Sequence, residues 1–257
     1  MNKCDAVLTI DQGNTKTKLS VVADGKILRT LTSAAPSLEA AVELLADFEI
    51  CGAIYCSVAG LDARFIESLR HLIHAPVEVL THSTPLPIRI CYDTPGTLGL
   101  DRVAASVAAA GLCRGEAVMV VDAGTAMTID IVDRDGRFRG GNIAPGLSLR
   151  FQSLHDFTGQ LPLVASDGPV PEFGSDTHTA IRAGVVRGAA CEITGAFRNA
   201  AGLFDVARLV ISGGDAPILL PLLENDIKNI IVVHDIVSLG LDLIFRYNDS
   251  IISNENL

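Results

Sequence analysis

Short runs of apolar residues alternate along the chain with longer segments in which apolar residues recur at helical spacing. The short runs have the length of strands; they are AVLTI (6–10), KLSVV (18–22), GAIYCSV (52–58), AVMVV (117–121), MTIDIV (127–132), ARLVIS (207–212) and IIVV (230–233). The helical pattern covers residues 37–48, 62–73, 101–112, 179–200 and 236–246. Strands that alternate with helices predict an α/β fold.

Two of the strand pairs share one pattern. LTIDQGNTKTKLSVV (8–22) and VMVVDAGTAMTIDIV (118–132) each carry an Asp at the end of an apolar run, then a Gly-containing turn, then a second apolar run. A constant offset of 111 residues relates Asp11 to Asp122, Gly13 to Gly124, and the Asp-Gly pair at 24–25 to that at 135–136. The offset predicts a duplicated strand-turn-strand-turn-strand unit.

One such unit in each half of the chain predicts two related domains that face each other across a cleft. The GLCRGE stretch at 111–116 separates a predicted helix from the second acidic strand and is the best candidate boundary. We therefore expect domains at 1–113 and 114–257.

The two turns have a composition that suits a phosphorylated ligand. A tight turn with Gly exposes backbone N–H groups that can cradle phosphate oxygens, and a neighbouring carboxylate can hold the accompanying cation. Either turn alone is more typical of a simple hairpin, but the matched pair favours a ligand. Neither GxxxxGK[ST] nor a GxGxxG after a strand occurs, so a P-loop or dinucleotide-binding fold has no support.

Composition excludes several classes of partner. A net charge of −10 and an isoelectric point near 5.0, without a clustered basic face, argue against nucleic acid. The six cysteines form no CxxC pair, which favours reduced thiols over a metal cluster. No apolar run approaches the roughly 20 residues needed to cross a bilayer, and the N-terminus lacks a signal-peptide pattern, so we expect a cytoplasmic protein.

The stretch CYDTPGTLGLDRVAASVAAAG (91–111) is a further candidate site. Its Pro-Gly turn leads into an Ala-rich helix whose first turn holds Asp101 and Arg102, where the helix dipole favours an anion. An Asp at this position is also an ordinary helix cap, so the segment alone leaves both readings open.

Several motifs, taken in order, resemble the type III pantothenate kinases of the actin-like superfamily, which includes acetate and sugar kinases. They are DQGNTKTK (11–18), a Tyr at 92 before Pro95, LGLDR (98–102), DAGTAMTID (122–130), GGNIAPG (140–146), GSDTHTAIRAG (174–184) and SGGDA (212–216). The similarity runs from about Leu8 to Leu241. Gln12 departs from it, because an apolar residue is more usual at this position.

This resemblance implies two actin-like (ribonuclease H-like) domains and the ATP-dependent phosphorylation of pantothenate to 4'-phosphopantothenate, the first step of coenzyme A biosynthesis. It implies Asp101 as the proton acceptor and Asp122 as the ligand of a monovalent cation, K+ or NH4+. ATP, with Mg2+, would contact Asp11, Gln12, Gly13, Asn14, Thr15, Lys16, Thr17, Lys18 and Thr125. Pantothenate would contact Tyr92, Gly99, Leu100, Asp101, Arg102 and Thr177, and members are typically homodimers.

The roles fit phosphoryl transfer, which needs charge neutralisation, positioning and a group that takes the hydroxyl proton. Each has an ordinary alternative: Lys18 as a solvated strand residue, Thr177 as a helix N-cap, Tyr92 as a strand aromatic. Two other functions stay open, namely another kinase of the superfamily that acts on acetate or a sugar, and a non-catalytic binding protein.

Overall fold

The computed structural model describes residues 6–255. The chain divides into two compact units, one made of the chain up to Leu112 together with the segment from Asp235, the other of Cys113–His234. Each unit is built on one sheet.

The sheet of the first unit has five strands in the order β3-β2-β1-β4-β5. The strands are β1 (Ala6–Gln12), β2 (Thr17–Ala23), β3 (Lys26–Ser33), β4 (Ile50–Ser57) and β5 (Val77–Val79). Strands β1, β2 and β3 are antiparallel neighbours, whereas β4 runs parallel to β1 and β5 runs parallel to β4. The carboxyl ends of β1 and β4 therefore lie at one edge of the sheet.

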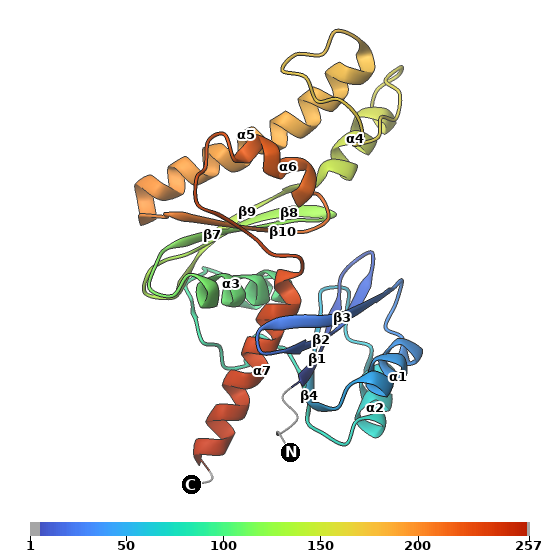
Figure 1. The fold of residues 1–257 in the computed structure, drawn as a ribbon, viewed down its shortest axis with the longest axis vertical. Coiled ribbons are helices and arrows are strands. Elements are labelled where there is room, and N and C mark those ends of the chain that lie inside the picture. The colour runs from blue at the N-terminus through green and yellow to red at the C-terminus, as the bar shows by residue number, and fades with distance from the viewer. Residues whose placement is uncertain (1–5, 256–257) are drawn as a thin grey trace. The chain divides into compact units, whose positions relative to one another are not determined.

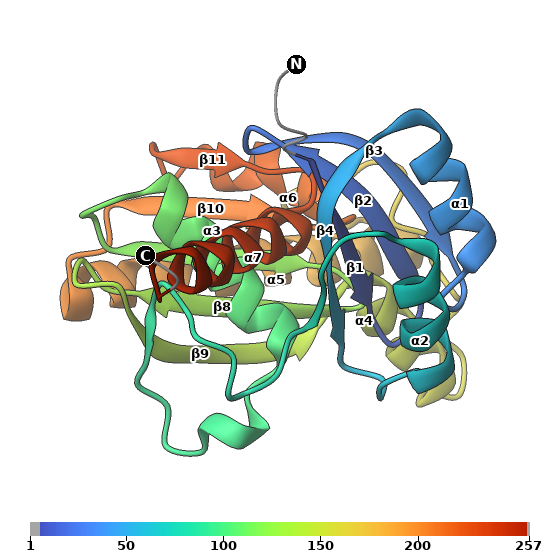
Figure 2. The ribbon, with the colours of Figure 1, turned by 90° about the horizontal axis from the view of Figure 1, so that it is seen from below.

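Helices cover both faces of this sheet (Figures 1 and 2). Helices α1 (Leu38–Asp47) and α2 (Ala63–Leu72) pack on one face, where the side chains of Leu8, Ile10 and Tyr55 are fully buried. Helices α3 (Leu100–Leu112) and α7 (Ile236–Glu255) cover the other face and pack against each other. Alternation along β1 and β4 turns Asp11 and Cys56 to the α3 side, because residues two apart share a face.

Two short elements lie between β5 and α3 along the chain. They are β6 (Arg89–Ile90) and the 3-10 turn η1 (Pro95–Thr97), and side-chain caps begin α1 and α2. Ser37 accepts the N–H of Ala40 and Asp62 accepts the N–H of Phe65, so both helices begin where a capping side chain satisfies a free N–H.

The second unit repeats the topology of the first. Its sheet contains β7 (Val118–Ala123), β8 (Ala126–Val132), β9 (Arg137–Pro145), β10 (Arg208–Ser212) and β11 (Ile230–Val232), in the order β11-β10-β7-β8-β9. Its helices are α4 (Leu147–Asp156), α5 (Thr177–Phe204) and α6 (Ala216–Leu223). Strand directions also match, because β7, β8 and β9 are antiparallel neighbours and β10 and β11 run parallel to β7.

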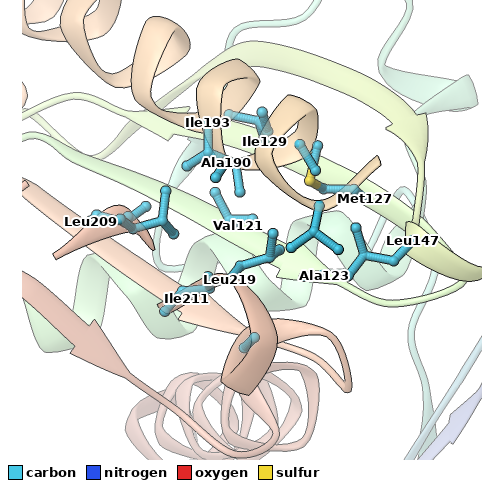
Figure 3. Packing of buried hydrophobic residues seen from close by; sticks show 14 of the residues in the cluster. Val121, Ala123, Met127, Ile129, Leu147, Ala190, Ile193, Leu209, Ile211 and Leu219 are labelled. Atoms are coloured by element: carbon cyan, nitrogen blue, oxygen red, sulfur yellow. The ribbon is translucent and has the colours of Figure 1, made fainter. Parts of the chain in front are cut away.

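The core of the second unit forms where α5 and α6 pack on the sheet (Figure 3). Val121 of β7 and Ile129 of β8 meet Ile193 of α5, and Ile211 of β10 meets Leu219 of α6. These side chains are at most 2 % exposed, so the apolar face of each element is removed from water.

The structure confirms the α/β class and the duplicated unit. Helices α4 and α6 were not predicted: α6, APILLPLL, is apolar on nearly every side and carries a proline, so it has no amphipathic period. Helix α5 begins at Thr177 rather than 179 and ends at Phe204, and α7 runs on to Glu255. Among the described residues, no helix combines the length and the apolar character that a membrane span requires.

Helix α7 follows the second unit along the chain but belongs to the first unit. It follows β11 just as α3 follows β5, which is why the sequence assigns it to a domain at 114–257. It nevertheless packs in the first unit, where the buried ring of Phe245 fills the space beside Gly52 of β4. The predicted domain boundary between residues 113 and 114, which follows from the repeated unit, stays a prediction. It differs from the two compact units in the placement of α7.

Candidate active site

The first acidic turn joins β1 to β2. The N–H of Gly13 donates to the carbonyl oxygen of Lys16 at 3.0 Å, which closes a turn of residues 13–16. The side chains of Asn14, Thr15 and Lys16 are exposed, whereas Thr17 is fully buried in β2. Hence the turn presents a short polar segment to solvent at the carboxyl end of β1.

Gln12, the departure from the family pattern, has a partner in the structure. Its Oε1 accepts a hydrogen bond from the hydroxyl of Tyr55, which is fully buried on β4, and this hydroxyl lies 3.4 Å from the N–H of Asp62 at the start of α2. Burial raises the pKa of Tyr55, and the N–H of Asp62 lowers it in part. The Tyr55 hydroxyl therefore remains a hydrogen-bond donor. Through it, Gln12 connects the first acidic turn to the start of α2.

Asp11 and Lys18 face each other across β1 and β2. The Lys18 Nζ atom lies 3.4 Å from Asp235 Oδ2, a residue that directly precedes α7. About a third of the Lys18 side chain is exposed, since its exposed fraction is 38 %. Lys18 is thus a partly exposed residue in an ion pair, not an ordinary solvated strand lysine. The sequence pattern gave no indication that Asp235 would be its partner.

Asp101 lies in the first turn of α3. Its Oδ1 accepts the N–H of Arg102 at 2.8 Å, so the carboxylate does contribute to the start of the helix. A Cβ at Gly99 would lie 2.5 Å from the same oxygen, so any larger residue at position 99 would displace the Asp101 carboxylate. The capping and proton-acceptor readings are therefore compatible.

Cys56 links Asp101 to the first acidic turn. It pairs with Asp11 in the register of β4 with β1, and it is fully buried. Burial raises the pKa of the Cys56 thiol well above its ordinary value, and the nearby carboxylates of Asp11 and Asp101 raise it further. Both carboxylates thus act on one buried thiol, so the two predicted site segments of the first unit influence the same residue. The register of two parallel strands, which carries no local sequence signal, places Cys56 beside Asp11.

Arg102 is a buried cation beside an aromatic ring. It is 5 % exposed, and its Cζ lies 5.9 Å from the centroid of the Tyr92 ring, within cation–π range. Tyr92 follows β6 and belongs to no strand, so the reading of a strand aromatic is wrong. Leu100 and Gly99 are partly exposed beside this pair. Together these residues form a polar and aromatic surface at the start of α3.

The second acidic turn joins β7 to β8. Asp122 is half-buried and lies opposite Thr128 of β8 and Ser212 of β10. The N–H of Gly124 donates to the carbonyl oxygen of Ala126 at 3.1 Å, and the carbonyl of the exposed Thr125 accepts the N–H of Gly146 at 3.0 Å. This turn is shorter than the first by one residue and is held by the segment that leads into α4.

Two glycines pack directly on this second turn. A Cβ at Gly146 would lie 2.0 Å from the carbonyl oxygen of Gly124, and one at Gly213 would lie 2.3 Å from that of Ala123. Gly213 also has a φ of 95°, which few other residues adopt. The motifs GGNIAPG and SGGDA therefore serve close backbone packing around the turn.

Asp215 is a site residue that sequence analysis missed. Its N–H donates to the carbonyl of Ala123 at 2.9 Å, while its Oδ2 accepts the N–H of Leu147 at 2.9 Å. Burial raises its pKa, and the Leu147 N–H lowers it in part. The carboxylate thereby joins the ends of β7 and β10 to the start of α4, and the SGGDA motif was its only signal.

Thr177 is the first residue of α5 and is exposed. The N-cap is Asp176, whose Oδ1 accepts the N–H of Thr179 at 3.0 Å, so the reading of Thr177 as a cap is wrong. The hydroxyl of Thr177 is consequently not required by the helix start.

The described residues contain no group of three or more His, Cys, Asp or Glu side chains that could hold a metal ion. This is compatible with Mg2+ in a kinase, because Mg2+ commonly binds one or two carboxylates together with substrate phosphates. Asp11, near the end of β1, is the candidate for such a carboxylate, and Asp122 is the candidate ligand of the monovalent cation that the family resemblance implies.

Comparison with known proteins supplies the family. The chain is 38 % identical over 245 residues to a type III pantothenate kinase of Phocaeicola vulgatus, covering 95 % of this chain and 99 % of that protein. It is 37 % identical over 243 residues to one of Bacteroides fragilis (94 % and 98 %), and 38 % identical over 244 residues to one of Porphyromonas gingivalis (94 % and 98 %).

Solved structures agree on the fold. A Campylobacter jejuni protein described as a Baf family transcriptional activator matches with a TM-score of 0.63 at 20 % identity, over 95 % of this chain and 99 % of that one. A Listeria monocytogenes protein described as an N-acetylmannosamine kinase matches with a TM-score of 0.56 at 15 % identity, over 95 % and 99 %. At these identities the likeness concerns the fold alone, and it confirms the predicted fold class.

The sequence profile of the type III pantothenate kinases matches residues 7–199, which hold every predicted site residue. This match and the relatives that cover nearly the whole chain agree with each other, and the chain belongs to the type III pantothenate kinase family.

Proposed function

We propose that this chain is an ATP-dependent pantothenate kinase, which forms 4'-phosphopantothenate in the first step of coenzyme A biosynthesis. Membership of the family supports the reaction. The observation that supports the proposal at the level of the site is that Asp11 pairs with Cys56 in the strand register, and that Asp101 at the start of α3 also raises the pKa of this thiol. Asp11, from the turn proposed to bind phosphate, and Asp101, the candidate proton acceptor, are then on the side of the sheet that α3 covers.

Asp101 takes the proton of the pantothenate hydroxyl as it attacks the terminal phosphorus of ATP. Residue 99, which lies next to the Asp101 carboxylate, is a glycine and has no side chain that would crowd the carboxylate. Arg102 is buried but lies against Tyr92, so its guanidinium is fixed in direction and can orient the pantothenate carboxylate. Gly99, Leu100 and Tyr92 complete the pantothenate site in the first unit.

Residues 11–18 bind the triphosphate. Backbone groups of the turn at Gly13, Asn14, Thr15 and Lys16 contact phosphate oxygens, and Lys18 supplies positive charge. Asp11 would hold Mg2+, which neutralises the triphosphate when it is bound. Gln12 supports the turn through its hydrogen bond with Tyr55, and Thr17 pairs with Gln12 and Ser33 in the sheet.

In the second unit, Thr125 contacts ATP, Thr177 contacts pantothenate, and Asp122 binds a monovalent cation, K+ or NH4+. Such a cation offsets the repulsion between an acidic protein and an incoming triphosphate. We further propose a homodimer in the cytoplasm, in keeping with the family resemblance.

The test is release of ADP from ATP and Mg2+, measured with pantothenate, with acetate, with glucose and with no acceptor. The product is identified by mass spectrometry as pantothenate plus one phosphoryl group. We expect release that depends on pantothenate alone. Release with acetate or glucose in its place would identify another kinase of the superfamily, and no release with any acceptor would favour the non-catalytic binding protein.

A further inference from the structure

Asp235 precedes α7 and lies beyond residues 7–199, the part of the chain that matches the family profile. It is 4 % exposed, although a carboxylate is rarely buried without compensating partners. Its surroundings therefore identify what the carboxylate does.

Two kinds of partner surround this carboxylate. Ser238 contributes its N–H, 3.3 Å from Oδ1, and its hydroxyl, 3.0 Å from Oδ2. Lys18 contributes the positive charge, with Nζ 3.4 Å from Oδ2. The serine contacts amount to an N-terminal cap of α7, but a cap needs no lysine on another element.

A chain of hydroxyl groups, of which those of Ser238 and Ser20 are buried, joins the first turn of α7 to the sheet. The hydroxyl of Ser238 lies 3.2 Å from Ser20 Oγ, which lies 2.8 Å from Thr30 Oγ1. Ser20 is two residues after Lys18 on β2, so both point to the same face of the sheet. Helix α7 thus holds Asp235 at a fixed place beside the strand that carries the lysine.

A lysine side chain has a flexible four-carbon stem, and it gives phosphate little directional binding unless something else restricts it. Asp235 contacts the ammonium end of that stem, and 38 % of the Lys18 side chain is still exposed to solvent. The pair accordingly restricts the ammonium group on a side chain that an anion can approach from solvent.

We propose that Asp235 is a positioning residue that holds Lys18 in the orientation in which it receives the triphosphate of ATP. This inference rests on the proposed function, because it takes Lys18 as a phosphate ligand. It predicts that the charge of Asp235, rather than its capping of α7, controls the use of ATP.

The test compares two variants that separate charge from capping. Asp235→Asn keeps an oxygen that accepts the Ser238 N–H but loses the charge, whereas Ser238→Ala loses the hydroxyl contact but keeps the ion pair. KM for ATP, KM for pantothenate and kcat are measured, together with calorimetric binding of a non-hydrolysable ATP analogue. Thermal unfolding establishes that both variants are folded.

We expect Asp235→Asn to raise KM for ATP and weaken analogue binding by about tenfold, as is typical when one charge-assisted contact is lost, with KM for pantothenate unchanged. Ser238→Ala stays within about twofold of wild type, because the N–H of residue 238 still binds Oδ1 and the ion pair with Lys18 is kept. In a Lys18→Met background, which lacks the positive charge, Asp235→Asn has no further effect on ATP, because coupled residues are not additive.

Unchanged or tighter ATP binding in Asp235→Asn would overturn the inference, as would equal effects on both substrates or a further loss in the Lys18→Met background. A wild-type protein without pantothenate-dependent turnover would contradict the proposed function instead. In that event the analogue titration still decides whether Asp235 acts through Lys18.

Discussion

Gly240 lies where α7 crosses α3, and its replacement by alanine is expected to destabilise the protein. A Cβ at this position would lie 1.8 Å from the carbonyl oxygen of Ala104 and 2.4 Å from its carbonyl carbon. Both atoms belong to the backbone of α3, so no side-chain rotation can relieve the contact. Normal carbon–oxygen contacts are about 3.3–3.6 Å, and the two helices would have to separate by about 1.5 Å.

Two opposing effects determine the size of the change. Replacing Gly by Ala inside a helix ordinarily stabilises by up to about 1 kcal/mol. Overpacking in a close-packed core costs about 1–3 kcal/mol, and the backbone clash at Gly240 places this case at the upper end. The net destabilisation is therefore about 2 kcal/mol, which lowers the melting temperature by about 4–8 °C for a chain of this size.

Urea and thermal unfolding followed by circular dichroism measure this change. Gly184 of α5 is the matched control, because it is helical and exposed and a Cβ there would meet nothing within 4 Å. Gly184→Ala should leave stability unchanged or increase it by up to about 1 kcal/mol. A Gly240→Ala protein as stable as wild type would show that α3 and α7 can move apart without loss of unfolding free energy. This result would refute the reasoning.

Three further predictions concern the proposed site. Asp101→Asn should keep the fold and pantothenate binding but lose about 10²- to 10⁴-fold in kcat, since the amide cannot accept a proton; near wild-type turnover would leave Asp101 as a helix-start residue only. Wild-type turnover should fall sharply when Na+ replaces K+ at constant ionic strength, and Asp122→Asn should be slow in both salts; an Asp122→Asn protein that responds to K+ like wild type would exclude this cation site. Cys191, which is exposed, should react rapidly with iodoacetamide in the native protein at pH 8, whereas Cys56 should react only on unfolding, because it is buried and its pKa is raised. Mass spectrometry of the labelled peptides measures both rates, and equal rates would contradict the burial of Cys56.

Local patterns predicted most of the fold. Strands β1, β2, β7 and β8 carry apolar runs interrupted by glycine turns, and α1 and α2 begin at the capping residues Ser37 and Asp62. Helix α6 escaped prediction because it is apolar on nearly every side, and the packing of α7 in the first unit escaped because chain order says nothing about which sheet a helix contacts.

The candidate site was predicted in its parts but not in its arrangement. Asp11 and Asp101 were recognised from motifs, yet their common neighbour Cys56 depends on how β4 aligns with β1. The pairing of Lys18 with Asp235 joins residues more than 200 positions apart, and such contacts have no local signal. Asp215 is intermediate, since its motif was visible while its bond to Leu147 was not.

The two acidic turns share a topology but differ in the charge opposite the aspartate. Asp11 faces Lys18 across the strand pair, whereas Asp122 faces Thr128. The second turn is one residue shorter, and the residue that corresponds to Lys18 is Ile129, so neither register would place a lysine opposite Asp122. A carboxylate with a lysine beside it can contribute to a site for a phosphate and its cation together, since the lysine supplies charge for the anion. A hydroxyl opposite a carboxylate brings no positive charge of its own to that position. The presence of a lysine in one unit and an uncharged residue in the other therefore distinguishes the two copies, in keeping with our proposal that the first turn binds the triphosphate and Asp122 a monovalent cation.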